Sequence, residues 1–163
     1  MNVLEQFNLN GKVAVVTGAG KGIGKGIAIA LAEAGADIAL ASRSKEDLDN
    51  LAREIESIGS KALVLPTDVT IANQLEALAT ITQKNLGPID IWVNNAGGLP
   101  DATPRYMTKT SEEEFDAQIG LNFKAVWQAC VIAAQNMSEE GGSIVNISSA
   151  TAKNMGPNPK NGP

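Results

Sequence analysis

The alternation of two apolar patterns constrains the fold of this chain more than any other feature. Five short apolar runs rich in β-branched residues alternate with four longer stretches whose apolar residues recur at helical spacing. The expected strands are residues 13–17, 38–41, 62–65, 89–93 and 143–147, and the expected helices are residues 23–34, 44–58, 71–86 and 111–137. Strands joined through helices pair in parallel by right-handed crossovers, and the helices cover both sheet faces. The sequence therefore predicts an α/β fold with a doubly wound parallel sheet.

Capping residues mark several ends of the expected helices. Ser44 precedes two acidic residues and is typical of an N-cap, and the segment Ser111–Glu114 has the sequence of a capping box. Gly35 and Gly59 stand where the first two helices are expected to stop. These residues predict helix boundaries independently of the apolar pattern.

Composition narrows the classes of function. The 163 residues are 44% apolar and carry a net charge of −5, which predicts one globular domain and argues against nucleic acid or an anionic membrane as a partner. Without histidine, Ser-His-Asp and Cys-His catalysis and histidine-containing metal sites are excluded, and no metal is expected. The single cysteine, Cys130, is expected to be a small buried apolar residue. No secretory signal or membrane span is recognisable, so a cytoplasmic location is expected.

A glycine-rich turn separates the first expected strand from the first expected helix. It reads Thr17-Gly18-Ala19-Gly20-Lys21-Gly22-Ile23-Gly24. Glycines here let the backbone approach a ligand closely, and free N–H groups at a helix N-terminus point at an anion. The P-loop pattern and the common G-x-G-x-x-G pattern both fail, whereas G-x-x-x-G-x-G fits Gly18, Gly22 and Gly24. The segment predicts a diphosphate site in a Rossmann-like fold, with a merely tight turn as the alternative.

Five segments, in chain order, resemble motifs of the short-chain dehydrogenase/reductase family. They are residues 17–24, Asp68-Val69, Asn94-Asn95-Ala96-Gly97, Asn122 and Ile147-Ser148-Ser149. The resemblance covers residues 9–150 and implies hydride transfer between a nicotinamide cofactor and a small-molecule carbonyl or alcohol. Members of the family often form dimers or tetramers, partly through the helix that corresponds to residues 111–137, so a homo-oligomer is also expected.

The same resemblance implies roles for individual residues. Cofactor contacts are expected from Thr17, Gly18, Gly22, Ile23, Gly24, Asp68, Val69, Asn95, Ala96 and Gly97. Catalytic roles are expected for Asn122, which would hold a water of a proton relay, and for Ser149, which would hydrogen-bond the substrate oxygen, with Ser148 as the alternative. Simpler interpretations stay open. Ser148 and Ser149 could simply terminate the fifth strand, and Asn122 could be an ordinary polar helix residue. Asn94 and Asn95 could brace their turn through side-chain-to-backbone bonds.

The end of the second expected strand bears on the choice of cofactor. An acidic residue there would accept a hydrogen bond from the 2′-hydroxyl of the adenosine ribose and repel a 2′-phosphate. This chain has Ser42-Arg43 instead, and Lys21 lies in the glycine loop. Both cations can pair with a 2′-phosphate, so NADP(H) is expected over NAD(H). The alternative is that either cation is simply solvated.

One element of the family pattern is absent from this sequence. The resemblance implies an acid/base Tyr-x-x-x-Lys on the helix after the fifth strand, but no tyrosine follows Tyr106. Tyr106 has a lysine three residues later, in a proline-flanked segment, and is expected to be a loop residue. The last residues, 150–163, are expected to be a loop. We therefore expect a sheet truncated after strand five, with an exposed apolar edge at residues 143–147, as the N-terminal part of a longer enzyme.

Three hypotheses of function follow. The first is an NADP(H)-preferring oxidoreductase whose parent chain supplies the tyrosine and lysine, so that the 163-residue chain itself is inactive. The second is a catalytically incomplete dinucleotide-binding module. The third is a structural or assembly fragment without a cofactor, which the exposed sheet edge would favour.

Overall fold

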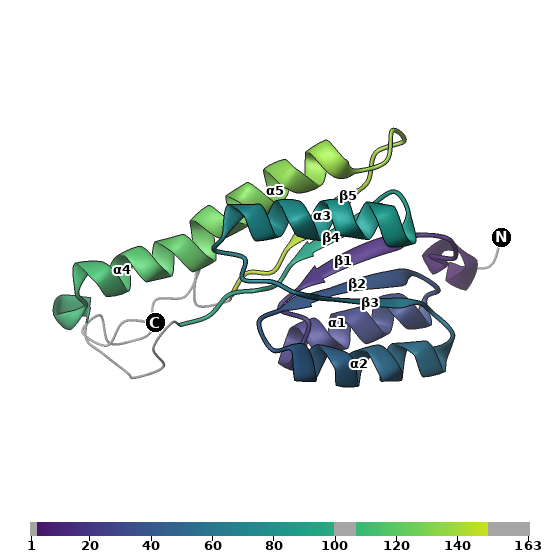
Figure 1. Ribbon diagram of the computed structural model, residues 1–163, viewed down its shortest axis with the longest axis horizontal. Coiled ribbons are helices and arrows are strands. Elements are labelled where there is room, and N and C mark those ends of the chain that lie inside the picture. The colour runs from purple at the N-terminus through teal and green to yellow at the C-terminus, as the bar shows by residue number, and fades with distance from the viewer. Residues whose placement is uncertain (1–2, 100–106, 150–163) are drawn as a thin grey trace.

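The computed structural model describes residues 3–99 and 107–149, and these contain a five-stranded parallel sheet. The strands are β1 (Val13–Thr17), β2 (Asp37–Ser42), β3 (Ala62–Pro66), β4 (Ile91–Asn94) and β5 (Ser143–Asn146). Their spatial order is β3-β2-β1-β4-β5, and every pairing is parallel (Figure 1). The chain moves outward from β1 to β3 and then crosses to β4 on the other side of β1. This reversal confirms the doubly wound α/β fold.

Helices pack against both faces of the sheet (Figure 1). The helical elements are η1 (Val3–Phe7), α1 (Gly22–Glu33), α2 (Lys45–Ile58), α3 (Ala72–Leu86), η2 (Met107–Lys109), α4 (Glu112–Ile119), the π-helical turn η3 (Gly120–Lys124) and α5 (Ala125–Asn136). Helices α1 and α2 contribute to one hydrophobic core, and α3 and α5 contribute to the other.

Alternate residues of the central strands fill the two cores. In β1, Ala14 and Val16 face α1 and α2, whereas Val15 faces α3 and α5. In β4, Val93 belongs to the first core and the fully buried Trp92 to the second. Side chains of a strand alternate between faces, so strands covered on both sides become continuous apolar runs. The sheet is thereby a rigid support for the loops at its ends.

The structure confirms the helix ends that the capping residues predict. The Ser44 side chain accepts a hydrogen bond from the backbone N–H of Asp47, and Gly59 closes α2 with a φ of 108°. Ser111 and Glu114 form the reciprocal capping box at the start of α4. Gly35, with a φ of 103°, follows the last residues of α1.

Most of the expected elements agree with the structure to within one residue at each end, but two of them differ by more. The single helix expected over residues 111–137 is interrupted by the π-helical turn η3. In this turn the Asn122 side chain donates a hydrogen bond to the carbonyl oxygen of Gln118, and Gly120 has no side chain to pack. The fourth strand begins at Ile91, not at residue 89, and Ile89 forms an isolated bridge to Met137. At this point the Asp90 carboxylate accepts a hydrogen bond from the backbone N–H of Val13 at 2.9 Å, and the Asp90 N–H donates to the Val13 carbonyl oxygen at 3.0 Å.

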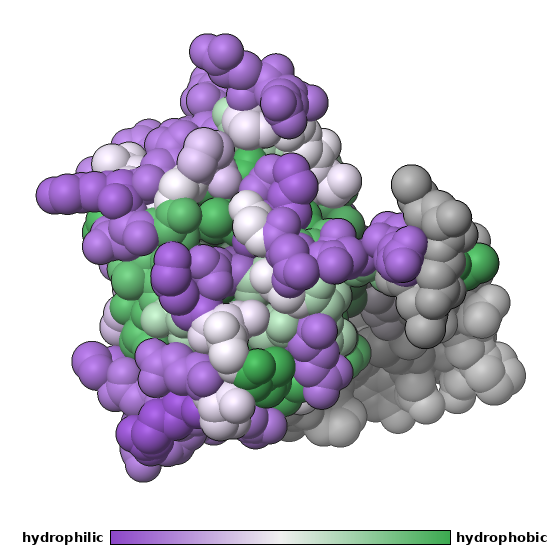
Figure 2. Space-filling view, turned by 90° about the vertical axis from the view of Figure 1, so that its right-hand side faces the viewer, coloured by the Kyte–Doolittle hydropathy of each residue, from purple (hydrophilic) through white to green (hydrophobic). Residues whose placement is uncertain are grey.

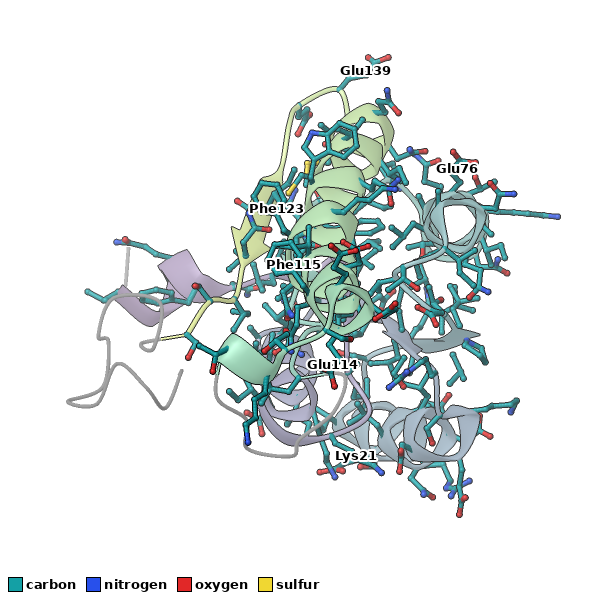
Figure 3. All side chains as sticks on the ribbon, turned by 90° about the vertical axis from the view of Figure 1, so that its left-hand side faces the viewer. Lys21, Glu76, Glu114, Phe115, Phe123 and Glu139 are labelled. Atoms are coloured by element: carbon teal, nitrogen blue, oxygen red, sulfur yellow. The ribbon has the colours of Figure 1, made fainter. Side chains whose placement is uncertain are left out.

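Large apolar side chains stay exposed along α4, η3 and α5. Phe115, Phe123 and Trp127 are 58%, 71% and 60% exposed, and Figure 3 shows the first two on the side of the molecule facing the viewer. Strand β5 is an outer strand of the described sheet and leaves Val145 44% exposed, in line with the expected apolar edge. Figure 2 shows the end of the molecule that lies opposite α4, where the strands begin. Its described surface is mostly hydrophilic and also contains apolar areas.

Candidate functional site: a dinucleotide cradle at the carboxyl edge of the sheet

Four loops gather at the carboxyl ends of the strands. The glycine loop follows β1, the Asp68 turn follows β3, residues 95–97 follow β4, and residues 147–149 follow β5. Because all these strands are parallel, the four loops lie at one edge of the sheet. The strand order reverses between β1 and β4, and open α/β sheets bind ligands at such a switch point. The fold therefore places the glycine loop and residues 95–97 next to each other at the expected binding position.

The glycine loop has the backbone that its sequence requires. Gly18 and Gly22 have φ angles of 64° and 55°, in the left-handed region that favours glycine. The N–H of Ala19 donates to the carbonyl oxygen of Ala41 at 3.1 Å, which holds the loop against β2. Lys21 is the N-cap of α1, but its side chain makes no capping hydrogen bond. The first N–H groups of α1 are thus oriented for an anion.

Thr17 joins the glycine loop to the turn after β4. Its buried hydroxyl accepts hydrogen bonds from the N–H groups of Asn95 at 3.0 Å and Ala96 at 3.1 Å and donates to the Val93 carbonyl at 3.2 Å. The Asn95 side chain returns the contact by donating to the carbonyl oxygens of Thr17 at 3.1 Å and Gly18 at 3.2 Å. Asn95 therefore braces the turn through side-chain-to-backbone bonds, which was the simpler interpretation of this residue.

Gly24 allows α1 to approach this braced turn. A Cβ added there would lie closer than 3.0 Å to the carbonyl oxygen of Gly18 and to the Asn95 side-chain nitrogen. Gly18 is similarly constrained, since its added Cβ would lie 2.9 Å from the Cα of Ala96. Gly22 requires glycine through its φ angle alone, because an added Cβ there meets nothing within 4 Å. The glycine spacing thus combines close packing with a special backbone conformation.

The Asn94 side chain bonds to other side chains, which differs from the alternative of side-chain-to-backbone bonds. Its buried side chain accepts from the indole N–H of Trp92 at 2.8 Å and donates to the Asn146 Oδ1 at 2.8 Å and to the Cys130 Sγ at 3.4 Å. The half-buried Cys130 thiol also lies 3.5 Å from Asn146 Oδ1, so Cys130 is not a purely apolar core residue as expected. This network connects β4, β5 and α5 directly behind the candidate site.

Asn122 fixes the start of the segment after Gly97. Its side chain pairs with both backbone groups of Gly98, accepting from the N–H at 2.9 Å and donating to the carbonyl at 2.9 Å. It also donates to Gln118 Oε1 at 2.9 Å, and Gly97 is close enough that an added Cβ would lie 3.0 Å from Asn122 Oδ1. Asn122 is thus brought to the same edge as residues 95–97. Gln118 also contributes to this arrangement and was not among the expected site residues.

The adenosine end of the expected site contains two cations and two carboxylates. Lys21 Nζ lies 3.2 Å from the Asp47 carboxylate, and Asp47 was not among the expected site residues. Asp68 accepts from the hydroxyl of Thr70 at 2.7 Å and from its N–H at 2.9 Å. These bonds hold the pKa of Asp68 below its ordinary value, and the charge of nearby Arg43 lowers it further. Asp68 is therefore an anionic side chain in a fixed orientation at the end of β3.

The remaining expected residues occupy different parts of this edge. Val69 is buried and lines a small cavity of about 10 Å³ with Thr17, Ala96 and residues of α5. Ile23 lies in the first turn of α1 with an exposed side chain, and Ser42 lies at the end of β2 beside the glycine loop. Ser148 and Ser149 are exposed and follow β5. Tyr106 and residues 150–163 lie outside the described residues.

Two structural absences concern only the residues that the structure describes. In 3–99 and 107–149, no three His, Cys, Asp or Glu side chains gather as metal ligands. Within the same ranges, no helix has the length and hydrophobicity needed to cross a bilayer.

Comparison with known proteins identifies the family. Residues 12–160 match the model of the short chain dehydrogenase family, and the chain belongs to that family. A curated relative, the short chain dehydrogenase/reductase astE of Aspergillus oryzae, is 39% identical over 150 residues, which cover 90% of this chain and 57% of the relative.

Solved structures agree with this assignment. A 7α-hydroxysteroid dehydrogenase in complex with NADH and 7-oxo glycochenodeoxycholic acid matches with a TM-score of 0.87 and 34% identity, over 94% of this chain and 59% of that one. A short chain dehydrogenase from Burkholderia cenocepacia in complex with NADP matches with a TM-score of 0.82 and 32% identity, over 90% and 58%. The chain thus spans less than two thirds of the length of these relatives.

Proposed function

We propose that this chain is the cofactor-binding part of an oxidoreductase that transfers hydride between a nicotinamide dinucleotide and a carbonyl or alcohol. The observation that carries the proposal is the cradle in which Thr17 and Asn95 join the glycine loop to the turn after β4. The left-handed backbone at Gly18 and Gly22, together with the first N–H groups of α1 that receive no side-chain cap, suits a closely approaching diphosphate. Relatives of the same fold are complexed with NADH in one case and NADP in another.

In this proposal, the protein residues bind and orient, and the bound cofactor supplies or accepts the hydride. The N–H groups of the glycine loop and of the first turn of α1 hold the diphosphate. The turn formed by Asn95, Ala96 and Gly97 supports the nicotinamide end. Ser149 hydrogen-bonds the substrate oxygen, and Asn122 orders the adjacent backbone and a relay water. Reduction of a carbonyl adds the hydride to carbon and a proton to oxygen, so an acid must complete the site.

The sequence supports the hypothesis that these 163 residues lack part of the catalytic machinery. It has no tyrosine after Tyr106 and hence no Tyr-x-x-x-Lys to act as that acid. The parent protein should oxidise NADPH with a member of an aldehyde, ketone and 3-oxoacyl panel, whereas the 163-residue chain should bind the cofactor without turnover. Turnover by the isolated chain would refute the binding-module hypothesis, and a parent inactive on the whole panel would count against the oxidoreductase.

We further propose a preference for NADP(H). Lys21 lies in the glycine loop and Arg43 follows β2, and either cation could pair with a 2′-phosphate of the adenosine ribose. Calorimetric titration of the chain is expected to show NADPH binding about five- to tenfold tighter than NADH, the effect of one or two partly solvated ion pairs. Equal affinities, or tighter binding of NADH, would contradict this role of the two cations.

The exposed apolar side chains of α4 to α5 and the outer position of β5 in the described part of the sheet support contacts between copies of the chain. We accordingly propose a homo-oligomer. The same surfaces would also serve a pure assembly fragment without a cofactor. NADPH binding at one molecule per chain would exclude that last hypothesis.

A further inference from the structure

The carboxylate of Asp47 occupies a position that the proposed cofactor preference does not explain. Its Oδ2 lies 3.2 Å from Nζ of Lys21, one of the two cations proposed to favour NADP(H). Hydrogen bonding with Ser44 and then with Lys21 holds the pKa of Asp47 below its ordinary value, so this group is anionic at neutral pH. Lys21 is therefore partly neutralised where a 2′-phosphate is expected to bind.

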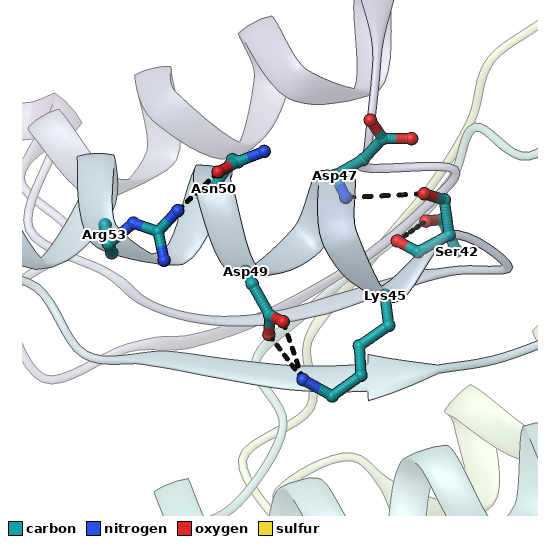
Figure 4. A network of polar contacts seen from close by, with 7 residues as sticks. Ser42, Lys45, Asp47, Asp49, Asn50 and Arg53 are labelled. Carbon is teal, nitrogen blue, oxygen red and sulfur yellow. Dashed lines mark hydrogen bonds and ion pairs between the residues drawn. The ribbon is translucent and has the colours of Figure 1, made fainter.

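The backbone fixes Asp47 against the site. Asp47 lies in the first turn of α2, and its N–H donates to the Ser44 side chain at 3.4 Å (Figure 4). From there it packs beside the glycine loop, since a Cβ added to Gly20 would lie 3.1 Å from the Asp47 Cβ and 3.0 Å from the Ser42 Oγ. Asp47 thus adjoins both the loop after β1 and the end of β2. Its side chain is 25% exposed, while that of Lys21 is 80% exposed and free to change its rotamer.

We propose that Asp47 is a specificity-determining residue that lowers the affinity of this site for a 2′-phosphate by competing for Lys21. The inference rests on the proposed function of the same site. A 2′-phosphate must draw Lys21 away from Asp47 and must tolerate a carboxylate nearby, and both effects oppose binding. A 2′-hydroxyl carries no charge and meets neither cost. Asp47 therefore keeps the preference for NADP(H) moderate and allows NAD(H) to bind.

The test compares two adenine nucleotides that differ only in the 2′-phosphate, adenosine 2′,5′-bisphosphate and 5′-AMP. In Asp47→Asn, calorimetry is expected to show about fivefold tighter binding of the bisphosphate, the size of effect that exposed charge pairs produce. The affinity for 5′-AMP should change less than about twofold, because the uncharged 2′-hydroxyl does not compete for Lys21. Asp47→Ser, which also removes the carboxylate, should reproduce the result.

The chain offers a matched control on the same helix. Asp49 pairs with Lys45 at 2.6 Å, and Figure 4 shows this pair on a different side of α2 from the Asp47 carboxylate. Asp49→Asn changes the net charge by the same amount and should leave the ratio of the two affinities within about twofold of the wild type. In a Lys21→Gln background, the gain from Asp47→Asn should fall to about twofold or less, because the competition requires Lys21.

Each outcome bears on a defined claim. An unchanged ratio in Asp47→Asn, an equal gain in Asp49→Asn, or a full gain without Lys21 would overturn the role of Asp47 while leaving the cofactor site intact. If the wild-type chain bound neither nucleotide nor NADPH, the proposed function itself would fail.

Discussion

Replacing Gly24 with alanine is expected to lower the free energy of unfolding by about 2 kcal/mol and to weaken NADPH binding at least about tenfold. The new Cβ would collide with the Gly18 carbonyl and the Asn95 side chain, and both of these groups belong to the cradle. Helix α1 must then move away from the turn after β4, which displaces the N–H groups proposed to hold the diphosphate. Urea unfolding and calorimetric titration measure the two effects.

Gly26 provides the control on the same helix. It is exposed, and an added Cβ meets nothing within 4 Å. Gly26→Ala should therefore raise the free energy of unfolding by up to about 1 kcal/mol, because alanine is the better helix former, and should leave NADPH affinity unchanged. Equal losses of NADPH affinity in both variants would show that cofactor binding does not depend on the close approach of α1 at Gly24.

Replacing Thr17 with valine is expected to lower the free energy of unfolding by about 3 kcal/mol. Valine has the same shape but removes the acceptor of the Asn95 and Ala96 N–H groups, at a position that is 1% exposed. Two backbone donors would then lose their partner beside the cofactor site, so NADPH affinity should fall as well. Urea unfolding at constant m-value checks the stability change.

Thr82 is an equally buried threonine for comparison. Its hydroxyl donates to the carbonyl oxygen of Leu78 at 2.7 Å within α3, where the helix also supplies a backbone donor. Thr82→Val leaves no group without a partner, and a change below about 1 kcal/mol is expected. A loss at Thr17 as small as the loss at Thr82 would mean that the hydroxyl does not hold the two loops together.

The sequence predicts much of the fold because its signals are local. Apolar periodicity locates the strands, and Ser44 and the Ser111–Glu114 capping box act through residues three positions away. The positive φ angles of Gly18 and Gly22 are also local, and none of these features requires knowledge of which strands become neighbours. Gly24 is different, because its close contacts include the Asn95 side chain after β4.

The missed features depend on the strand order and on side-chain positions. The bond from Asn94 to Asn146 exists because β4 pairs with β5, which joins residues far apart in the sequence. The pair of Lys21 with Asp47 likewise requires the glycine loop to lie beside the start of α2. Nothing in either local sequence signals these contacts. The π-helical turn at Asn122 was also missed, because its side-chain bond to Gln118 competes with a regular helix that the apolar pattern equally allows.

The central claim is that the carboxyl edge of the sheet, around the glycine loop, binds a nicotinamide dinucleotide. It is tested most directly by titrating the isotope-labelled chain with NADPH and following the backbone amide signals by NMR. The account predicts saturating shifts at Gly18, Gly22 and Ala96, with the amides near Asp90, at the opposite edge, unchanged. Absence of any shift at millimolar NADPH, or shifts confined to the region of Asp90, would contradict it.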